Sequence, residues 1–157
     1  MEHPVLKQED LDILIQSVLK GTDLFLVETE LKGSQASPAL WVYIESEKGN
    51  ISLERCADIS RELGFVLDAS GWRDKKYTLN VSSPGLDRPL RDKRQYVNNI
   101  GRKADVSFRK DGKQTSRSGT LEDVQSNHIS LRSDGNIIQI PWSEVLETRI
   151  KASVTKP

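Results

Sequence analysis

The chain has 157 residues, of which 36% are hydrophobic and 29% are charged, a composition typical of globular proteins. Its length permits one ordinary domain or two small ones, because domains commonly hold about 50 to 200 residues. No apolar run approaches the roughly 18 residues that cross a bilayer, and the acidic first segment lacks the pattern of a signal peptide. The single cysteine, Cys56, can form neither an internal disulfide nor a thiolate metal site. These features predict a cytoplasmic protein that holds no metal or other cofactor.

The charges are unevenly distributed, although the net charge is zero. Residues 1–85 contain 9 Lys or Arg and 14 Asp or Glu, a net charge of −5, whereas residues 86–157 contain 14 and 9, a net charge of +5. Such asymmetry favours two domains, 1–85 and 86–157, with the basic one offered to an anionic partner. The alternative is a chance partition of the charges.

The first half begins with the pattern of a helix followed by a hairpin. Apolar residues recur at helical spacing over 9–20, and Gly21 follows as a typical helix end. Residues 24–31 and 40–44 have the composition of strands, and a Gly/Ser/Pro loop over 33–38 separates them. We therefore expect an antiparallel pair of strands after the first helix.

A second helix and a third strand complete the first half. Ser52 can cap the helix, because its hydroxyl can accept a hydrogen bond from a free amide two or three residues on. The expected inner stripe consists of Leu53, Cys56, Ala57, Ile59, Ser60, Leu63 and Leu67. Gly64 predicts a shortened or bent helix, and residues 77–81 predict a strand, so the element order is αββαβ.

The second half opens with a short helix. Asp92 and Gln95 have the spacing of a capping box, and Gly101 marks the end of the helix. The inner face of this helix is expected to hold Tyr96, Val97 and Ile100.

The pattern beyond the short helix is entirely that of strands. The expected strands cover residues 106–109, 119–124, 129–132, 137–140 and 145–152, and turn residues such as Asp111-Gly112 and Asp134-Gly135 separate them. Gly119 belongs to the strand expected over 119–124, where the missing Cβ permits a sharp bend. Five short strands predict a small Sm-like or SH3-like barrel, and the whole chain is therefore expected to belong to the α+β class.

The segment between the halves is constrained by two prolines and a glycine. It consists of Ser82, Ser83, Pro84, Gly85, Leu86, Asp87, Arg88, Pro89 and Leu90. Pro84 disfavours a helical Ser83, and Gly85 can take the positive φ that the third position of a type II turn requires. We expect a stiff linker that directs Leu86 and Leu90 towards packing surfaces.

This segment closely resembles the hallmark motif of the RimP ribosome maturation factors. The resemblance extends to residues 51–60 and 66–68 in the second helix and to the strand at 77–81. It implies an αββαβ domain, the Ser-Pro-Gly-Leu-Asp-Arg-Pro linker and a small barrel, in the same order as the elements expected here. The Gly64-Phe65 pair departs from the family pattern, where smaller helix formers are expected.

The resemblance also implies a function. It predicts a monomeric ribosome assembly factor that binds the small ribosomal subunit, aids its late maturation, and contacts rRNA and small-subunit ribosomal protein twelve. Neither a membrane nor a small-molecule substrate is implied. Such a factor needs no catalytic chemistry, because stronger binding to one assembly intermediate is enough to shift the population.

The residues themselves offer little for an enzyme. His3 lies near the terminus and His128 at a turn, Cys56 is expected in the core, and the chain contains no phosphate-binding G-x-x-x-x-G-K loop. The adjacent Asp87 and Arg88 more often form a turn cap and an ion pair than a catalytic pair. We therefore expect a binding protein.

The basic half supplies candidate ribosome-binding residues. They are Arg88, Arg91, Lys93, Arg94, Arg102, Lys103, Arg109, Lys110, Lys113 and Arg117. Lys and Arg side chains bind phosphates without reading sequence, and the few rings of this half, Tyr96, Phe108 and Trp142, argue against base stacking. An alternative function is a general RNA-binding Sm-like module not dedicated to the ribosome. Each charge could also belong to an ordinary solvated surface.

Overall fold

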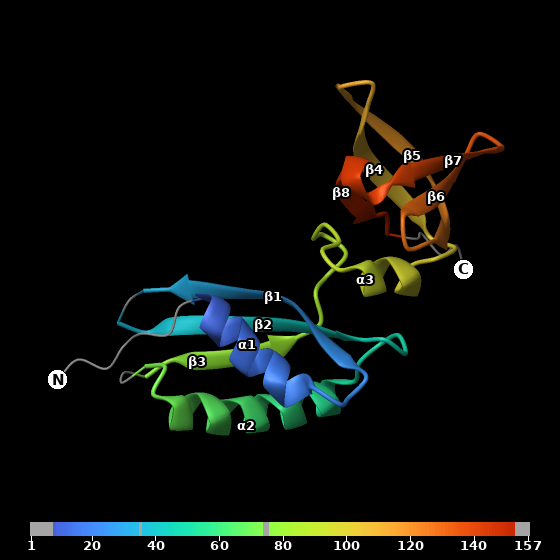
Figure 1. Cartoon of the computed structure of the whole chain (residues 1–157). Helices are drawn as coiled ribbons and strands as arrows, with labels where there is room; N and C mark the ends of the chain where they lie inside the picture. Colours follow the sequence, from blue (N-terminus) through green and yellow to red (C-terminus); the bar gives the residue numbers. More distant parts are fainter. Residues whose placement is uncertain (1–7, 35, 74–75, 153–157) are drawn as a thin grey trace. The chain divides into compact units, whose positions relative to one another are not determined.

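The computed structural model describes residues 8–34, 36–73 and 76–152, and it divides into two compact units between Pro84 and Gly85 (Figure 1). The first unit combines helices with a three-stranded sheet, and the second is built on a five-stranded antiparallel sheet. The predicted α+β class, with a small all-β second part, is confirmed.

The first unit has the predicted element order αββαβ. Its elements are α1 (Gln8–Leu19), β1 (Leu24–Gly33), β2 (Pro38–Ser46), α2 (Leu53–Ser70) and β3 (Thr78–Ser82). The sheet order is β1-β2-β3, with β2 antiparallel to β1 and parallel to β3. A parallel pair cannot be joined by a tight turn, so α2 forms the crossover between β2 and β3.

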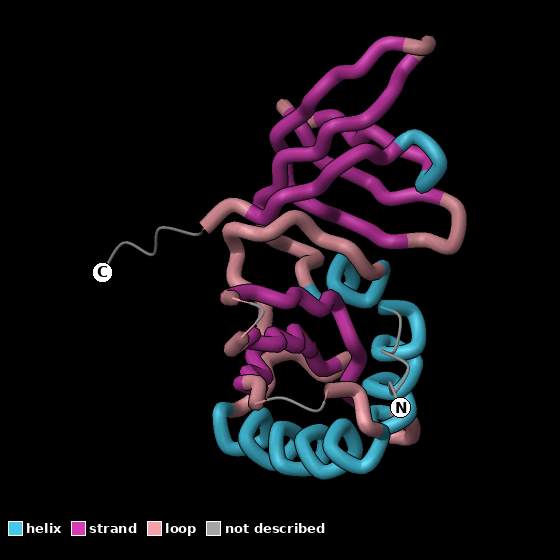
Figure 2. The backbone as a smooth tube through the Cα atoms, turned by 90° about the vertical axis from the view of Figure 1, so that its left-hand side faces the viewer, coloured by secondary structure: helices cyan, strands magenta, loops and turns pink. Residues whose placement is uncertain are grey.

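Both helices of this unit cover the same face of the sheet. Every second residue of β2 turns towards them, because side chains alternate across a strand. The buried core residues are Leu11, Ile15, Leu19, Leu24, Leu40, Val42, Ile44, Ile59, Leu63, Leu67 and Trp72. Figures 1 and 2 show α1 and α2 against this layer of strands.

Helix α2 is not shortened at Gly64. The Ser52 hydroxyl accepts a hydrogen bond from the Arg55 amide at 3.1 Å, as predicted, and Gly71 ends the helix with φ of 70°. The helix runs without interruption through Gly64, so the expected shortening is wrong. A glycine costs a helix about 1 kcal/mol, and the burial of Leu63 and Leu67 on the inner face outweighs that cost.

The inner stripe of α2 is narrower than predicted. Cys56 and three aliphatic residues after it are buried, but Leu53 is 89% exposed and Ala57 is also exposed. Ala57 lies about 100° around the helix from Cys56, which turns it away from the sheet. Leu53 is the first residue of the helix, one turn before the first buried position. Both assignments to the core were therefore wrong.

An ion pair ties the start of β1 to α2. The Asp23 carboxylate accepts hydrogen bonds from both terminal nitrogens of Arg55, one of them at 2.9 Å, and from the Ser46 hydroxyl. The Asp23 carbonyl also accepts a hydrogen bond from the Glu47 amide at 2.8 Å. The Arg55 guanidinium, followed by the Ser46 hydroxyl, holds the pKa of Asp23 well below its ordinary range.

This pair predicts acid sensitivity. A carboxylate with a depressed folded-state pKa stabilises the fold above its unfolded pKa of about 4, and the contribution is lost as the pH falls through the folded-state pKa. Asp23→Asn should therefore be less stable than the parent at pH 7, and the difference should shrink steadily below about pH 4. Urea unfolding of both proteins across this range measures the difference, and a pH-independent gap would contradict the prediction.

The second unit contains the predicted short helix and five strands. They are α3 (Lys93–Asn98), β4 (Lys103–Lys110), β5 (Lys113–Val124), β6 (His128–Ser133), β7 (Asn136–Pro141) and β8 (Val145–Ile150), with a 3-10 turn at Trp142–Glu144. The sheet order is β7-β6-β5-β4-β8, antiparallel throughout. The start of β5 precedes the predicted start, because pairing with β4 extends the strand through a polar stretch that carries no local strand signal.

Two tight turns of the same type close the β4–β5 and β6–β7 hairpins. Asp111 and Gly112 both have positive φ, of 54° and 76°, and so do Asp134 and Gly135, of 52° and 80°. Positive φ at both central residues defines the type I′ turn, whose twist matches that of the paired strands and for which Asp-Gly is a favoured sequence. The Asp-Gly signals therefore set the register of both hairpins.

Gly119 allows β5 to pass very close to β6. A Cβ on this residue would lie 2.3 Å from the carbonyl oxygen of Arg132 and 3.1 Å from the Leu131 side chain. The residue pairs with Ala104 of β4 on one side, and the next residue, Thr120, pairs with Arg132. The glycine thus stands where β5 passes from one hairpin to the next.

Substitution of two glycines by alanine should have opposite effects. Gly119→Ala forces a side chain against a backbone carbonyl and should destabilise the second unit by about 1–3 kcal/mol or more. Gly64→Ala places its Cβ in ordinary contact with Leu79 at 3.9 Å and should stabilise α2 by about 0.5–1 kcal/mol. Denaturant unfolding of each variant measures the change, and equal tolerance of both would contradict the close approach of β5 to β6.

The short helix α3 begins as predicted but buries less than predicted. The Asp92 side chain accepts a hydrogen bond from the Arg94 amide, and the Gln95 side chain accepts one from the Asp92 amide at 3.0 Å, which completes the capping box. Tyr96 is buried and donates a hydrogen bond to Thr148 at 2.8 Å. Val97 and Ile100 are 53% and 44% exposed, so their assignment to the inner face was wrong. A helix of six residues turns only one narrow face inward.

The linker motif turns at a different place from the one predicted. Gly85 does not have the positive φ of a type II turn; instead its carbonyl accepts a hydrogen bond from the Arg88 amide at 3.3 Å, so the turn begins at Gly85. Leu86, in the middle of this turn, is 43% exposed, contrary to the prediction. Leu90 packs against the second core, and its amide donates to the Thr148 carbonyl at 2.8 Å.

Candidate nucleic-acid interface

The β4–β5 hairpin carries cations on its inner face. Val106 and Phe108 of β4 are buried in the second core, and because side chains alternate along a strand, Lys110 lies on the same face. Their partners on β5 are Arg117, Thr115 and Lys113. The face that forms the core near Gly119 therefore continues outward as a polar, basic surface.

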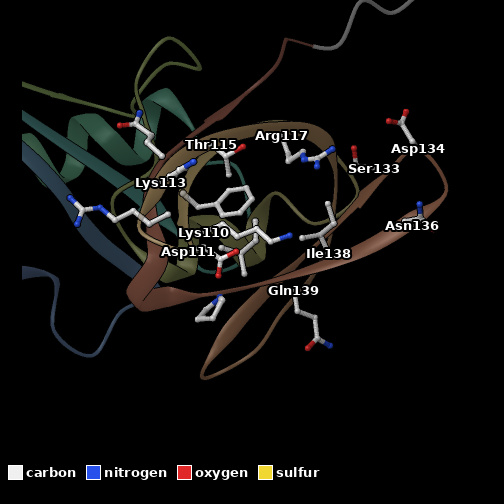
Figure 3. Close-up of a pocket in the computed structure, with 15 residues that line it drawn as sticks. Lys110, Asp111, Lys113, Thr115, Arg117, Ser133, Asp134, Asn136, Ile138 and Gln139 are labelled. Atoms are coloured by element: carbon white, nitrogen blue, oxygen red, sulfur yellow. The ribbon is translucent and has the colours of Figure 1, made fainter.

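This basic surface borders a groove of about 790 Å³. The second wall comes from the β6–β7 hairpin and includes Ser133, Asn136 and Ile138 (Figure 3). Figure 3 shows Lys110, Lys113, Thr115 and Arg117 around the same hollow as Ile138. The remaining lining residues are Phe108, Arg109, Asp111, Gln114, Asp134, Gln139, Ile140 and Pro141. Four basic and two acidic side chains give the lining a net charge of +2.

The four basic residues of the groove are not neutralised by ion pairs. Within residues 8–34, 36–73 and 76–152, no carboxylate oxygen is found within 4.0 Å of Arg109, Lys110, Lys113 or Arg117. Other cations of the same unit are paired, with Arg132 on Glu122, Arg149 on Glu147 and Lys151 on Asp105. The groove thus concentrates positive charge that the fold leaves available to an anion.

The other six candidates are placed differently. Arg88 and Arg91 lie on the segment before α3, and Lys93 and Arg94 lie in its first turn. Lys93 lies 5.0 Å from the Trp142 ring centre, and Arg94 pairs with Asp92 at 2.9 Å, which lowers the pKa of that carboxyl.

Arg102 and Lys103 follow α3 at the start of β4. Arg102 contacts the Asn99 side chain at 3.5 Å. The structure therefore brings four of the ten predicted residues together around one groove and places the other six at α3 and its flanks.

Sequence reasoning missed the second wall of the groove. Ser133, Asn136, Ile138 and Gln139 all line it, but only the pairing within the second unit brings these residues of β6 and β7 to the cations of the β4–β5 hairpin. One sequence signal could have indicated a polar surface next to the core. Along one face of a single strand, the residues Lys113, Thr115, Arg117, Gly119 and Leu121 change from polar to apolar.

Rings contribute little to the exposed surface of the second unit. Tyr96 and Phe108 are both 5% exposed, and Trp142 is half-buried against Tyr96 with ring centres 4.8 Å apart. The Trp142 indole also donates a hydrogen bond to the Gln125 carbonyl at 2.8 Å. These rings act in packing and do not form a stacking platform for bases.

Other candidate chemistry has a structural explanation. Cys56 is buried, and burial raises the pKa of its thiol, which disfavours the reactive thiolate. His128 contacts the neighbouring Asn127 side chain at 2.7 Å, and His3 lies outside the described residues. Among the described residues, no group of three acidic, histidine or cysteine side chains is placed to hold a metal ion. The helices in this part of the chain are also too short or too polar to span a membrane.

The chain is thus a two-part α+β protein, and the groove in its second unit has a lining of net positive charge. Residues 14–87, from α1 to the linker motif, match the family model described as RimP N-terminal domain. This match supports membership of the RimP family, and at the level of that family it supports a ribosome maturation factor. The family resemblance expected from the linker and α2 is confirmed.

The pairing of like charges across the hairpin predicts an unusual stability effect. Lys110 and Lys113 are direct partners on either side of the turn, and like charges in this position are destabilising. Lys113→Glu should replace the repulsion by attraction and stabilise the isolated protein by about 0.2–1 kcal/mol. Lys103→Glu is the matched control, because its partner is the uncharged Thr120. Urea unfolding measures the stability of both variants, and an equal change in stability for the two would contradict the expected repulsion.

Proposed function

We propose that the chain binds the small ribosomal subunit during its maturation and that its second unit contacts rRNA. Family membership supports a role in ribosome maturation, and the unneutralised cations of the groove support an anionic partner for this unit. The proposed rRNA-facing residues are the ten candidates, with Arg109, Lys110, Lys113 and Arg117 at the centre. Phosphate contacts of this kind give affinity and position, without sequence information.

The proposed mechanism is selective binding. A factor that binds one assembly intermediate more tightly than its alternatives shifts the population towards that intermediate by its differential affinity alone. No bond is made or broken, and no nucleotide or cofactor is consumed. The factor leaves when the mature subunit no longer offers the preferred surface.

The two halves of the chain are proposed to have different partners. We propose two domains, 1–85 and 86–157, within a cytoplasmic monomer. The net charge of −5 on the first suits a basic protein, and small-subunit ribosomal protein twelve is the partner that the family resemblance suggests. The net charge of +5 on the second suits rRNA.

Sedimentation with separated subunits tests the proposal. The purified chain should co-sediment with small subunits, more with immature than with mature ones, and much less with large subunits. With about five phosphate contacts and a duplex-like slope of roughly −0.9 per contact, affinity should fall on the order of 500-fold between about 50 and 200 mM salt. Protein contacts that do not release counterions would reduce this loss.

Charge reversals show which cations carry the binding. The pairs Lys113→Glu with Arg117→Glu and Arg102→Glu with Lys103→Glu should each weaken binding and flatten its salt dependence. Lys20→Glu with Lys48→Glu, two exposed positions of the first unit, is the matched control and should not do so.

Two results would contradict the proposal. Preference for large subunits would exclude the assignment to the small subunit. Equal binding to any RNA, with no preference for a subunit, would favour the general RNA-binding module instead.

A further inference from the structure

We infer that the groove between the β4–β5 and β6–β7 hairpins binds an unpaired segment of RNA in preference to a duplex. The inference rests on the proposed function, which makes rRNA the partner of the second unit, and it adds the structural class of RNA that the groove selects. Three features of the groove support this inference.

The first feature is that cations line the wall of the groove. Lys110, Lys113 and Arg117 continue the inner face of the hairpin, on the same side as the buried Phe108. A duplex is convex, so it can touch the rim of a groove of about 790 Å³ but cannot enter it. A single strand can enter, and its phosphates then reach cations that a duplex reaches poorly.

The second feature is the character of the walls. Polar side chains such as Thr115, Asn136 and Gln139 supply hydrogen-bond donors and acceptors, and Ile138 and Pro141 supply apolar surface. Unpaired nucleotides expose their base edges and faces to such groups, whereas A-form duplexes hide most of them in a deep, narrow groove. A few polar groups on a partly apolar wall are typical of pockets for ligands of nucleotide size.

The third feature is the pair of carboxylates in the turns. Asp111 and Asp134 line the groove beside the cations. Among the described residues, no ion pair within 4.0 Å joins either carboxylate to a Lys or Arg of the groove. A carboxylate can accept hydrogen bonds from a ribose 2′-hydroxyl or a base amino group. The carboxylate side chains of an acidic peptide only accept hydrogen bonds, so these two residues favour RNA over such a peptide.

The groove also predicts little sequence preference. Phe108 is 5% exposed and Trp142 is engaged with Tyr96, so bases gain no strong stacking on a ring. The affinity for RNA then depends mainly on contacts between the cations of the groove and the phosphates. For three contacts with a single-strand slope of roughly −0.7 each, affinity should fall about 20-fold between about 50 and 200 mM salt.

Fluorescence anisotropy with the full chain tests the inference. The probe is a labelled RNA oligonucleotide of mixed sequence without self-complementarity, measured alone and after annealing to its complement, so that the two ligands differ only in pairing. The single strand should bind at least several-fold more tightly than the duplex. The double variant Lys113→Glu with Arg117→Glu should remove that preference. Its affinity for the single strand should fall only about 3-fold between about 50 and 200 mM salt.

The controls separate this inference from the proposed function. Lys20→Glu with Lys48→Glu should leave the preference for single strands unchanged, and circular dichroism should show that each variant is folded. Tighter binding of the duplex, an unchanged preference in the groove variant, or displacement of the RNA by a polyglutamate peptide at equal charge concentration would each overturn the inference.

Sedimentation with small subunits is measured in parallel. If the chain prefers small subunits but the oligonucleotide result fails, the proposed function stands and the inference is wrong. If the chain shows no preference for small subunits while single strands still bind in the groove, the inference stands as a property of the groove and the proposed function fails.

Discussion

The geometry of the second unit depends on a missing side chain. A Cβ at Gly119 would lie 2.3 Å from the Arg132 carbonyl oxygen, so β5 can approach β6 this closely only with glycine at that position. The close approach lets one long strand pair with β4 along its first part and with β6 along its second. The groove is lined by residues of these two hairpins.

The charge of the groove follows from strand alternation beyond the core. Residues on one face of β5 read Lys113, Thr115, Arg117, Gly119 and Leu121, so the same face is basic at the open end and apolar where the core begins. Lys110 stands directly across from Lys113, which costs the free protein stability. This repulsion is consistent with a site that binds an anion.

Much of the fold was predictable because the signals are local. Helical spacing, the Ser52 cap, the Asp92–Gln95 capping box and the two Asp-Gly turns each depend on residues close in sequence, and the structure confirms all of them. The αββαβ order and the five strands follow from the same patterns. Gly85 was wrongly assigned a positive φ because more than one turn fits a Pro-Gly pair, and the observed turn begins two residues later, at Gly85 itself.

The site was only partly predictable because it depends on long-range pairing. The ten cations could be counted from sequence, but Ile138 and Asn136 join four of them only through the β6–β7 hairpin. Likewise, Val97 and Ile100 looked like core residues by hydrophobicity alone, but Val97 lies on the exposed side of the short helix α3 and Ile100 lies beyond its end.

Photo-crosslinking tests the central claim, that the groove faces rRNA, most directly. A photoreactive amino acid at Asn136, an exposed residue in the lining of the groove, should form crosslinks to small-subunit rRNA when the full chain is bound to small subunits. The same probe at Gln16, an exposed residue of α1, should form few such crosslinks. Crosslinks from residue 136 to ribosomal proteins alone, or rRNA crosslinks from residue 16 alone, would contradict the account.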